Sequence, residues 1–199
     1  GIPTYRLPRE VLDREINAIM ALGVEARTGE FLARDRIVEL GTSYDAVIVA
    51  AGFGLPTRLD VPGNTLGGVE DGTRFLHRVN MEGGEAVSGH VIVLGGGNTA
   101  MDCARSARRL GAAVSVATRG DFRASPKEIE AAREEGVELL AQHVPQSLLG
   151  SEAVEGVRFD SPATSHDLPA DRVILALGQV PAPPAWAHAP STAAGMPRL

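Results

Sequence analysis

The chain contains a single cysteine, and this scarcity excludes several kinds of site. Because Cys103 has no second cysteine among the 199 residues, no disulfide, Cys-x-x-Cys redox pair or cysteine-ligated metal cluster can form within the chain. The histidines do not show metal-ligand spacing, and no Ser-His-Asp or Cys-His arrangement can be argued from the sequence. We therefore assign no metal site and no catalytic residue.

Long apolar runs and an excess of positive charge are also absent. The sequence has no run of eighteen apolar residues and no signal-peptide pattern, so we expect a cytoplasmic protein without membrane association. The net charge of -6 disfavours a nucleic-acid backbone as the partner. With 44% hydrophobic and 22% charged residues, the composition is that of an ordinary globular chain of one or two domains.

The most informative stretch runs from residue 90 to residue 119. The apolar run at residues 91–94 is too short for a helix and rich in β-branched residues, which predicts a buried strand of a parallel sheet. Three glycines follow, and then a pattern typical of an amphipathic helix continues until Gly111. A second apolar run at residues 114–117 predicts another strand. The whole stretch is therefore a β-turn-α-β unit.

The turn between this strand and helix has the spacing of a dinucleotide-binding loop, Gly95-x-Gly97-x-x-Ala100. Gly95 would permit the tight turn, Gly97 would let the backbone approach a pyrophosphate, and Ala100 would keep the helix close to the sheet. The free N–H groups of the helix start favour the same anion. We therefore predict a cofactor-binding loop made of Gly95, Gly96, Gly97, Asn98, Thr99 and Ala100, where Asn98 and Thr99 add side-chain donors. The alternative is a glycine-rich turn without a ligand.

The residues after the second strand indicate which dinucleotide is bound. An NAD site usually has Asp or Glu there, which accepts a hydrogen bond from the ribose 2′-hydroxyl. This chain has Arg119 instead, and Arg123 follows shortly after. Because guanidinium groups suit a 2′-phosphate, we predict that NADPH is the cofactor. The alternative is that both arginines are solvated surface residues, since Lys127 is the only lysine and arginine supplies the other positive charges.

Outside this unit, helical patterns cover residues 8–22, 72–79 and 126–136. In the first of them, Leu12, Ile16, Ile19 and Met20 are expected to form a buried face. Apolar runs predict strands at residues 24–27, 31–33, 37–40, 44–52, 137–141, 154–160 and 171–178. The run at 137–141 would complete a βαβαβ half of a Rossmann-type sheet, and the run at 154–160 is typical of a small antiparallel meander.

Several stretches resemble the small subunit of NADPH-dependent glutamate synthase and occur in the same order. They are GIPTYRLP at residues 1–8, YDAVIVAAG at 44–52, LGGGNTAMD at 94–102 and ADRVILALGQVP at 170–181. The segment RASPKEIEAAREEGVE at 123–138 is similar to that subunit and to the amino-terminal half of dihydropyrimidine dehydrogenase. The resemblance covers nearly all of the chain.

This resemblance implies an FAD domain interrupted by an NADPH domain. Together with the patterns above, it predicts an α/β chain with a Rossmann-like FAD/NAD(P)-binding fold, in which helices cover one face of a central parallel sheet and a small β-meander covers the other. Residues 1–85 would be a partial FAD-domain segment with linkers, 86–180 the NADPH-binding domain, and 181–199 a Pro/Ala-rich return segment or tail. Gly178 resembles the turn near the nicotinamide ribose, and Arg119 and Arg123 fall where the family has basic residues for the 2′-phosphate.

The resemblance also indicates which parts of the family pattern we do not find in this chain. The family's FAD-binding glycine motif and cysteine-rich iron–sulfur region would precede Gly1, and its final Gly-Asp flavin motif would follow Leu199. We therefore expect this chain to bind NADPH without FAD and without turnover, whereas the full-length parent would be a flavoprotein oxidoreductase. The expected partners are the flavin domain and the iron–sulfur electron-transfer partners of the parent, or a second copy that covers the faces of residues 1–60.

Two other functions are compatible with a glycine-rich loop. One is a Rossmann module that senses dinucleotides without redox chemistry. The other is a methyltransferase-like domain that binds S-adenosylmethionine. The methyltransferase fold usually has an acidic residue at the end of the second strand. This chain has Thr118 and Arg119 there, which argues against a methyltransferase.

Overall fold

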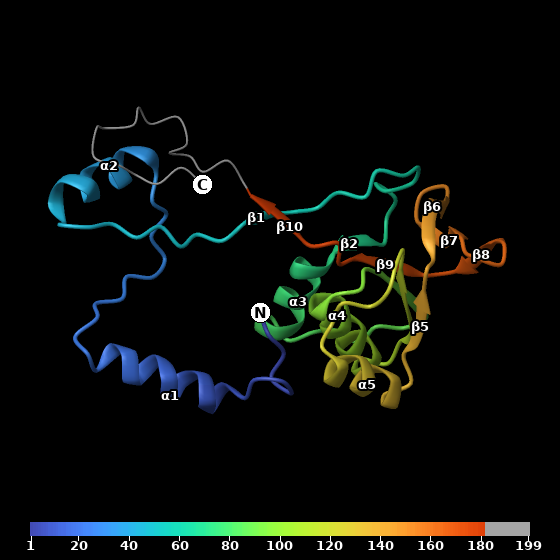
Figure 1. Cartoon of the computed structure of the whole chain (residues 1–199), viewed down its shortest axis with the longest axis horizontal. Coiled ribbons are helices and arrows are strands. Elements are labelled where there is room, and N and C mark those ends of the chain that lie inside the picture. Colours follow the sequence, from blue (N-terminus) through green and yellow to red (C-terminus); the bar gives the residue numbers. More distant parts are fainter. Residues whose placement is uncertain (182–199) are drawn as a thin grey trace. The chain divides into compact units, whose positions relative to one another are not determined.

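The computed structural model describes residues 1–181, which divide into two units (Figure 1). The first unit comprises residues 1–14 and 56–178, and the second comprises residues 15–55 and the segment from residue 179 onward. The first unit holds the central sheet. Residues 1–14 and 56–85 group with this sheet, and the assignment of flavin and NADPH domains by residue range stays a prediction.

The first unit is built on a sheet of five parallel strands. Their spatial order is β2 (Val69–Asp71), β9 (Arg172–Leu175), β3 (His90–Leu94), β4 (Ala113–Thr118) and β5 (Glu138–Ala141). The central strand β3 pairs with β9 on one side and β4 on the other, so its residues 91–94 are buried on both faces. This is why a continuous apolar run, rather than an alternating one, predicts it correctly.

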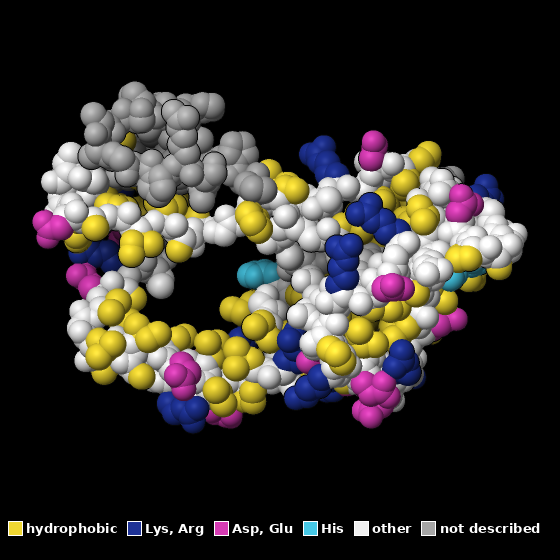
Figure 2. Space-filling model, viewed as in Figure 1, with side chains coloured by type: hydrophobic (Ala, Val, Ile, Leu, Met, Phe, Trp, Pro, Cys, Tyr) yellow, Lys and Arg dark blue, Asp and Glu magenta, His cyan; other side chains and the backbone are white. Residues whose placement is uncertain are grey.

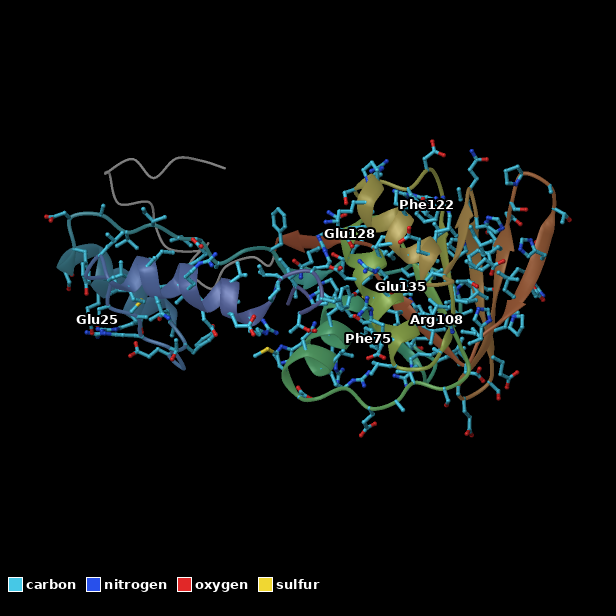
Figure 3. All side chains as sticks on the ribbon, turned by 90° about the horizontal axis from the view of Figure 1, so that it is seen from below. Glu25, Phe75, Arg108, Phe122, Glu128 and Glu135 are labelled. Atoms are coloured by element: carbon cyan, nitrogen blue, oxygen red, sulfur yellow. The ribbon has the colours of Figure 1, made fainter. Side chains whose placement is uncertain are left out.

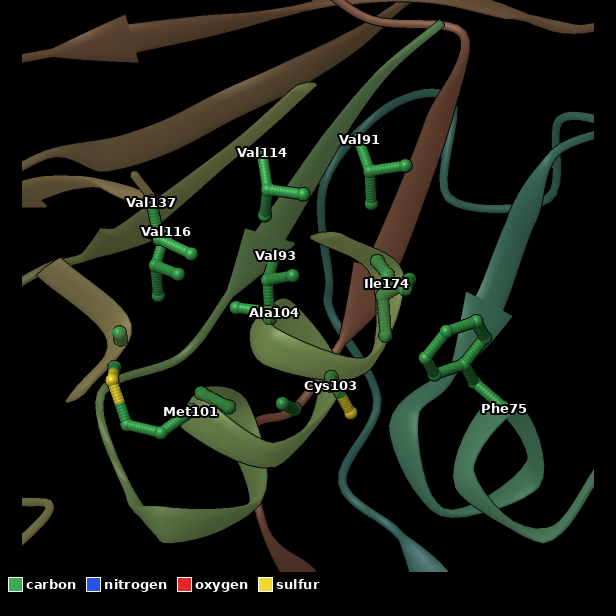
Figure 4. Packing of buried hydrophobic residues seen from close by; sticks show 14 of the residues in the cluster. Phe75, Val91, Val93, Met101, Cys103, Ala104, Val114, Val116, Val137 and Ile174 are labelled. Carbon is green, nitrogen blue, oxygen red and sulfur yellow. The ribbon is translucent and has the colours of Figure 1, made fainter. Parts of the chain in front are cut away.

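Three helices cover one face of the sheet, namely α3 (Gly72–Met81), α4 (Asn98–Arg109) and α5 (Pro126–Glu134). Side-chain caps start two of them. Asp71 accepts hydrogen bonds from the first turn of α3, and Ser125 accepts one from the N–H of Glu128 in α5. Figure 4 shows the core on this face, where Val91, Val93, Val114, Val116 and Ile174 of the sheet meet Phe75, Met101, Cys103 and Ala104 of the helices.

A three-stranded antiparallel meander covers the other face of the sheet. It consists of β6 (Val144–Gly150), β7 (Val154–Asp160) and β8 (Ser165–Pro169). Ile92 and Leu94, which alternate with the helix-facing valines of β3, pack there with Val157 and Phe159. The expected architecture is therefore confirmed, with helices on one face of a parallel sheet and a meander on the other.

The second unit corrects several expectations. Residues 24–27, 31–33 and 44–52 do not form strands, and the run at 37–40 lies in helix α2 (Arg34–Ser43). A strand needs a neighbour for its N–H and C=O groups, and among the described residues only β1 (Gly54–Pro56) and β10 (Gln179–Pro181) pair in this part of the chain. The apolar run at 44–52 is therefore left at the surface, where Ile48 is 92% exposed.

Helix α1 (Arg9–Met20) lies where the sequence pattern places it, but its expected buried face is wrong. None of these four residues is buried: Leu12 and Met20 are half-buried, and Ile16 and Ile19 are 47% and 55% exposed. Figure 2 shows hydrophobic side chains at the surface along α1. The 3.6-residue periodicity predicted the helix correctly, but periodicity alone does not say what packs against the apolar stripe.

Candidate functional site

A cleft of about 680 Å³ lies at the carboxyl ends of β3, β4 and β9. The chain runs from β3 to β4 and β5 on one side of the sheet, whereas β9 and β2 lie on the other side of β3. This reversal of strand order is the place where open α/β sheets bind ligands. The cleft is lined by the glycine-rich loop at 94–97 with Thr99, by residues 117–121 with Arg123, by 57–60, by 144–145 and by 176–178.

The first glycines of the loop are required by the protein itself. Gly95 has a φ of +145°, and a Cβ on it would lie 2.3 Å from the carbonyl oxygen of Ala176 at the end of β9. A Cβ on Gly96 would lie 2.7 Å from the Oγ1 atom of Thr118 at the end of β4. Neither position has room for a side chain because the loop passes close to both neighbouring strands.

Gly97 differs, because the protein does not require a glycine there. Its φ of -95° and ψ of -178° are open to any residue, and a Cβ would meet no atom within 4 Å. Gly97 is the N-cap of α4 and lines the cleft, so an added side chain would enter the cleft. A glycine at this position leaves the space that a ligand's pyrophosphate needs beside the backbone, and the first N–H groups of α4 supply donors for it.

Two residues of the predicted loop do not line the cleft. The Oδ1 atom of Asn98 accepts a hydrogen bond from the N–H of Ser125 at 2.9 Å, so this side chain ties α4 to the loop before α5. Ala100 is fully buried against the sheet, where its small side chain keeps α4 close, as the sequence predicted. The other predicted site residues, Gly178 included, lie on the cleft.

The cleft contains both signs of charge. Arg119 and Arg123 line it from the segment after β4, and both side chains are exposed. Among the described residues neither guanidinium forms an ion pair, so both are available to a phosphate. Asp60 and Asp121 also line the cleft. The backbone N–H of Arg123 donates to the carbonyl of Gly96 at 2.7 Å, which fastens this segment to the glycine loop.

Arg58 is a cleft residue that the sequence analysis missed. It lies within residues 1–85, which the sequence predicted as a partial FAD-domain segment with linkers, and it is far from the glycine loop in sequence. Two features hold the segment there. The N–H of Thr57 donates to the carbonyl of Gly178 at 3.0 Å, and Leu59 packs against the meander-side core. No local pattern around Arg58 indicates these long-range contacts, so the sequence carried no signal for it.

No cluster of three or more potential ligands occurs in the part of the chain that the structure describes. Cys103 is buried, and burial raises the pKa of its thiol well above the ordinary value. Among the described helices, none combines the length and the apolar character that a membrane span requires.

The sequence pattern of the family described as "Pyridine nucleotide-disulphide oxidoreductase" matches residues 11–196 of the chain. The chain belongs to this family. The expected relationship is confirmed by the curated relatives. The small chain of glutamate synthase [NADPH] from Halomonas elongata is 34% identical over 218 residues, which cover 94% of this chain and 46% of the relative.

Other members of the family carry different names and cofactors. The beta subunit of NADP(+)-dependent formate dehydrogenase from Moorella thermoacetica is 36% identical, over 90% of this chain and 29% of the relative. The PreT subunit of NAD-dependent dihydropyrimidine dehydrogenase from Escherichia coli is 33% identical, over 90% of this chain and 44% of the relative. The chain thus spans less than half the length of these relatives, whose names mark them as parts of larger enzymes.

Two solved structures of thioredoxin reductases share the fold. Thioredoxin reductase from T. acidophilum superposes with a TM-score of 0.56 at 15% identity, over 66% of this chain and 44% of that chain. The enzyme from Giardia duodenalis gives 0.53 at 22% identity, over 62% and 41%. The family match also agrees with NADPH and FAD as the expected cofactors, and it gives no support to the S-adenosylmethionine alternative.

Proposed function

We propose that this chain is the NADPH-binding portion of a flavin-dependent oxidoreductase similar to the glutamate synthase small subunit. The observation that supports this most is the cleft beside Gly97, where an unstrained glycine with open space next to it adjoins a helix start and two arginines that form no ion pair with any described residue. Beyond the general preference for glycine at a helix N-cap, the fold has no need of a glycine at this position, whereas a ligand needs the room. A dinucleotide meets all three features at once, because it carries a pyrophosphate and, in NADPH, a separate phosphate.

The roles of the residues follow from their places on the cleft. The N–H groups at the start of α4 would bind the pyrophosphate, where the helix dipole favours negative charge. Arg119 and Arg123 would bind the 2′-phosphate, and the turn at Gly178 would lie beside the nicotinamide ribose. When bound, NADPH supplies a hydride that a flavin can accept. The chain's own part in this chemistry is to hold the dinucleotide and to fix its orientation.

The preference for NADPH has to come from this chain's own residues, because the relatives' names include both NADP and NAD. The position after β4 holds Arg119, where an NAD site would have an acidic residue. Asp121 follows but is two residues further along, within the loop that also carries Arg123. We infer that the arginines decide the preference, since a guanidinium matches a phosphate and gains less from a hydroxyl.

Replacing Arg119 with alanine tests this assignment. We expect the Kd for NADPH to rise about tenfold, a loss of about 1.4 kcal/mol, while the Kd for NADH changes less than about threefold. Isothermal titration calorimetry of the 199-residue chain with both cofactors measures the two changes. Arg133→Ala is the matched control, because Arg133 is an exposed arginine of α5 paired with Glu130 and does not line the cleft. Equal losses for NADPH and NADH would contradict the assignment of the 2′-phosphate to Arg119.

The partners belong to the same proposal. The relatives are named as chains or subunits of larger enzymes, which supports partner domains for this chain in general. We propose a flavin domain and iron–sulfur electron-transfer partners, with electrons leaving the flavin toward the latter. The exposed apolar residues of 15–55 agree with a surface that a further domain or a second copy covers.

A further inference from the structure

The first residues of the chain dock on α4 and α5, away from the cleft lining. A turn closed by hydrogen bonds to the carbonyl of Pro3, whose side chain is buried, presents Tyr5 and the residue after it to the helices. The Tyr5 ring lies 4.6 Å from the guanidinium carbon of Arg105 and 4.1 Å from that of Arg109. Its hydroxyl donates to the backbone carbonyl of Asp102 at 3.2 Å, and burial raises the pKa of Tyr5 to about 12. These contacts fix Tyr5 in one position on α4.

Arg6 bridges two carboxylates that belong to different helices. Its Nη1 atom lies 2.7 Å from Oδ2 of Asp102 in α4, and its Nε atom lies 3.1 Å from Oε1 of Glu128 in α5. The two acidic side chains are only 8% and 9% exposed. A planar guanidinium can serve both at once, which a single ammonium group cannot do with the same geometry. Arg105 supplies a second cation to Glu128 at 2.6 Å.

The two acidic residues sit at the helix starts that build the dinucleotide site. Asp102 lies one turn after the first residue of α4, and Glu128 lies in the first turn of α5. Figure 3 labels Glu128 on α5. The same two helix starts are also joined by the hydrogen bond from Ser125 to Asn98 and by those from residues 123 and 124 to the Gly96 carbonyl. Arg6 therefore adds an ionic link between two helix starts that hydrogen bonds also join.

We propose that Arg6 is a positioning residue of the dinucleotide site, which neutralises Asp102 and Glu128 and so holds the starts of α4 and α5 where the glycine loop and Arg123 face one ligand. The proposal rests on the proposed function, because it assumes that this cleft binds the dinucleotide. Two buried carboxylates without a shared cation repel each other and resist burial. Burial and the charge of Glu128 both raise the pKa of Asp102, while the hydrogen bonds from Arg6 oppose the rise. Removing Arg6 would therefore push the two helix starts apart.

The test compares single and double substitutions. For Arg6→Gln we expect the Kd for NADPH to rise about tenfold by titration calorimetry, together with a lower melting temperature. Adding Asp102→Asn removes one of the repelling charges, so Arg6→Gln/Asp102→Asn should return the Kd to within about threefold of wild type. If Arg6 merely docked the first residues, the double variant would bind as weakly as the single one. This rescue separates positioning by charge from a general loss of structure.

The matched control is Arg158→Gln, which breaks an exposed two-point ion pair with Asp167 on the meander and should leave the Kd unchanged. If Arg6→Gln does not fold, Arg6→Lys carries the comparison: it keeps one positive charge but cannot bridge both carboxylates, so its Kd should also rise, and adding Asp102→Asn should again restore the Kd. A folded Arg6→Gln chain that binds NADPH like wild type would overturn this inference alone. A wild-type chain that binds neither NADPH nor NADH would overturn the proposed function and this inference with it.

Discussion

Replacing Gly97 with valine is expected to abolish NADPH binding while the protein stays folded. The backbone at Gly97 is extended, with φ -95° and ψ -178°, a region that valine adopts readily. The added side chain meets no protein atom within 4 Å of its Cβ and enters the cleft beside the helix start. Since the pyrophosphate would occupy this space, we expect the Kd to rise by about 100-fold or more. Calorimetric titration and thermal denaturation measure the two effects separately.

Gly41→Val provides the matched control for this experiment. Gly41 also has no atom within 4 Å of an added Cβ, but it lies in α2, outside the cleft. Because valine has a better helix propensity than glycine, this substitution should not destabilise α2, and it should leave NADPH binding at the wild-type level. Retention of tight binding by the Gly97→Val chain would show that the dinucleotide does not lie against this loop, and the function proposed for the cleft would lose its main support.

The glycine loop was predictable from the sequence because its determinants are local. The apolar run at 91–94, the glycines and the helical pattern up to Gly111 follow each other without interruption, and each has one structural meaning in that order. The same holds for α5, where Ser125 caps the helix and Pro126 occupies its first turn. The elements whose start, apolar periodicity and end are all determined by neighbouring residues in the sequence were confirmed.

Residues 24–52 show where this reasoning fails. An apolar run such as 44–52 indicates residues that are more stable when buried. It forms a strand only if another strand exchanges backbone hydrogen bonds with it. No described segment does so, and the run is exposed instead. The residues at 37–40 have a pattern compatible with either structure and lie in α2. Whether a neighbouring strand is present depends on the whole folded protein, so the local sequence pattern did not determine it.

The candidate site was predictable in its loop and incomplete elsewhere. Arg119 was found because it follows a strand whose end has a defined role in dinucleotide sites. Arg58 and Arg6 were not found, since each acts through contacts with residues distant in sequence. Asn98 stays a predicted ligand donor through its Nδ2 atom, and the sequence did not indicate that its Oδ1 atom accepts from Ser125. The spacing of a motif specifies backbone geometry well, but it does not specify which way a polar side chain turns.

Gly95→Ala should destabilise the fold itself, in contrast to a change at Gly97. The φ of +145° at Gly95 is open to glycine alone, and holding alanine there costs about 1–3 kcal/mol. The new methyl group would also lie 2.3 Å from the backbone oxygen of Ala176, and relieving this overlap costs a further 1–3 kcal/mol or so. We expect the free energy of unfolding to fall by about 4 kcal/mol, which lowers the melting temperature by about 10 °C.

The control for Gly95→Ala is Gly97→Ala, which adds the same methyl group two residues further along the chain. Gly97→Ala has open space and an unstrained backbone, so its free energy of unfolding should fall by less than about 1 kcal/mol. Denaturant unfolding of both variants beside wild type gives the comparison. Equal stability of the two variants would mean that the backbone at Gly95 can leave the positive-φ region at little cost. In that case the tight turn after β3 would not need a glycine. This turn brings the loop to the carboxyl end of β9 and forms the wall of the cleft on which a bound pyrophosphate depends.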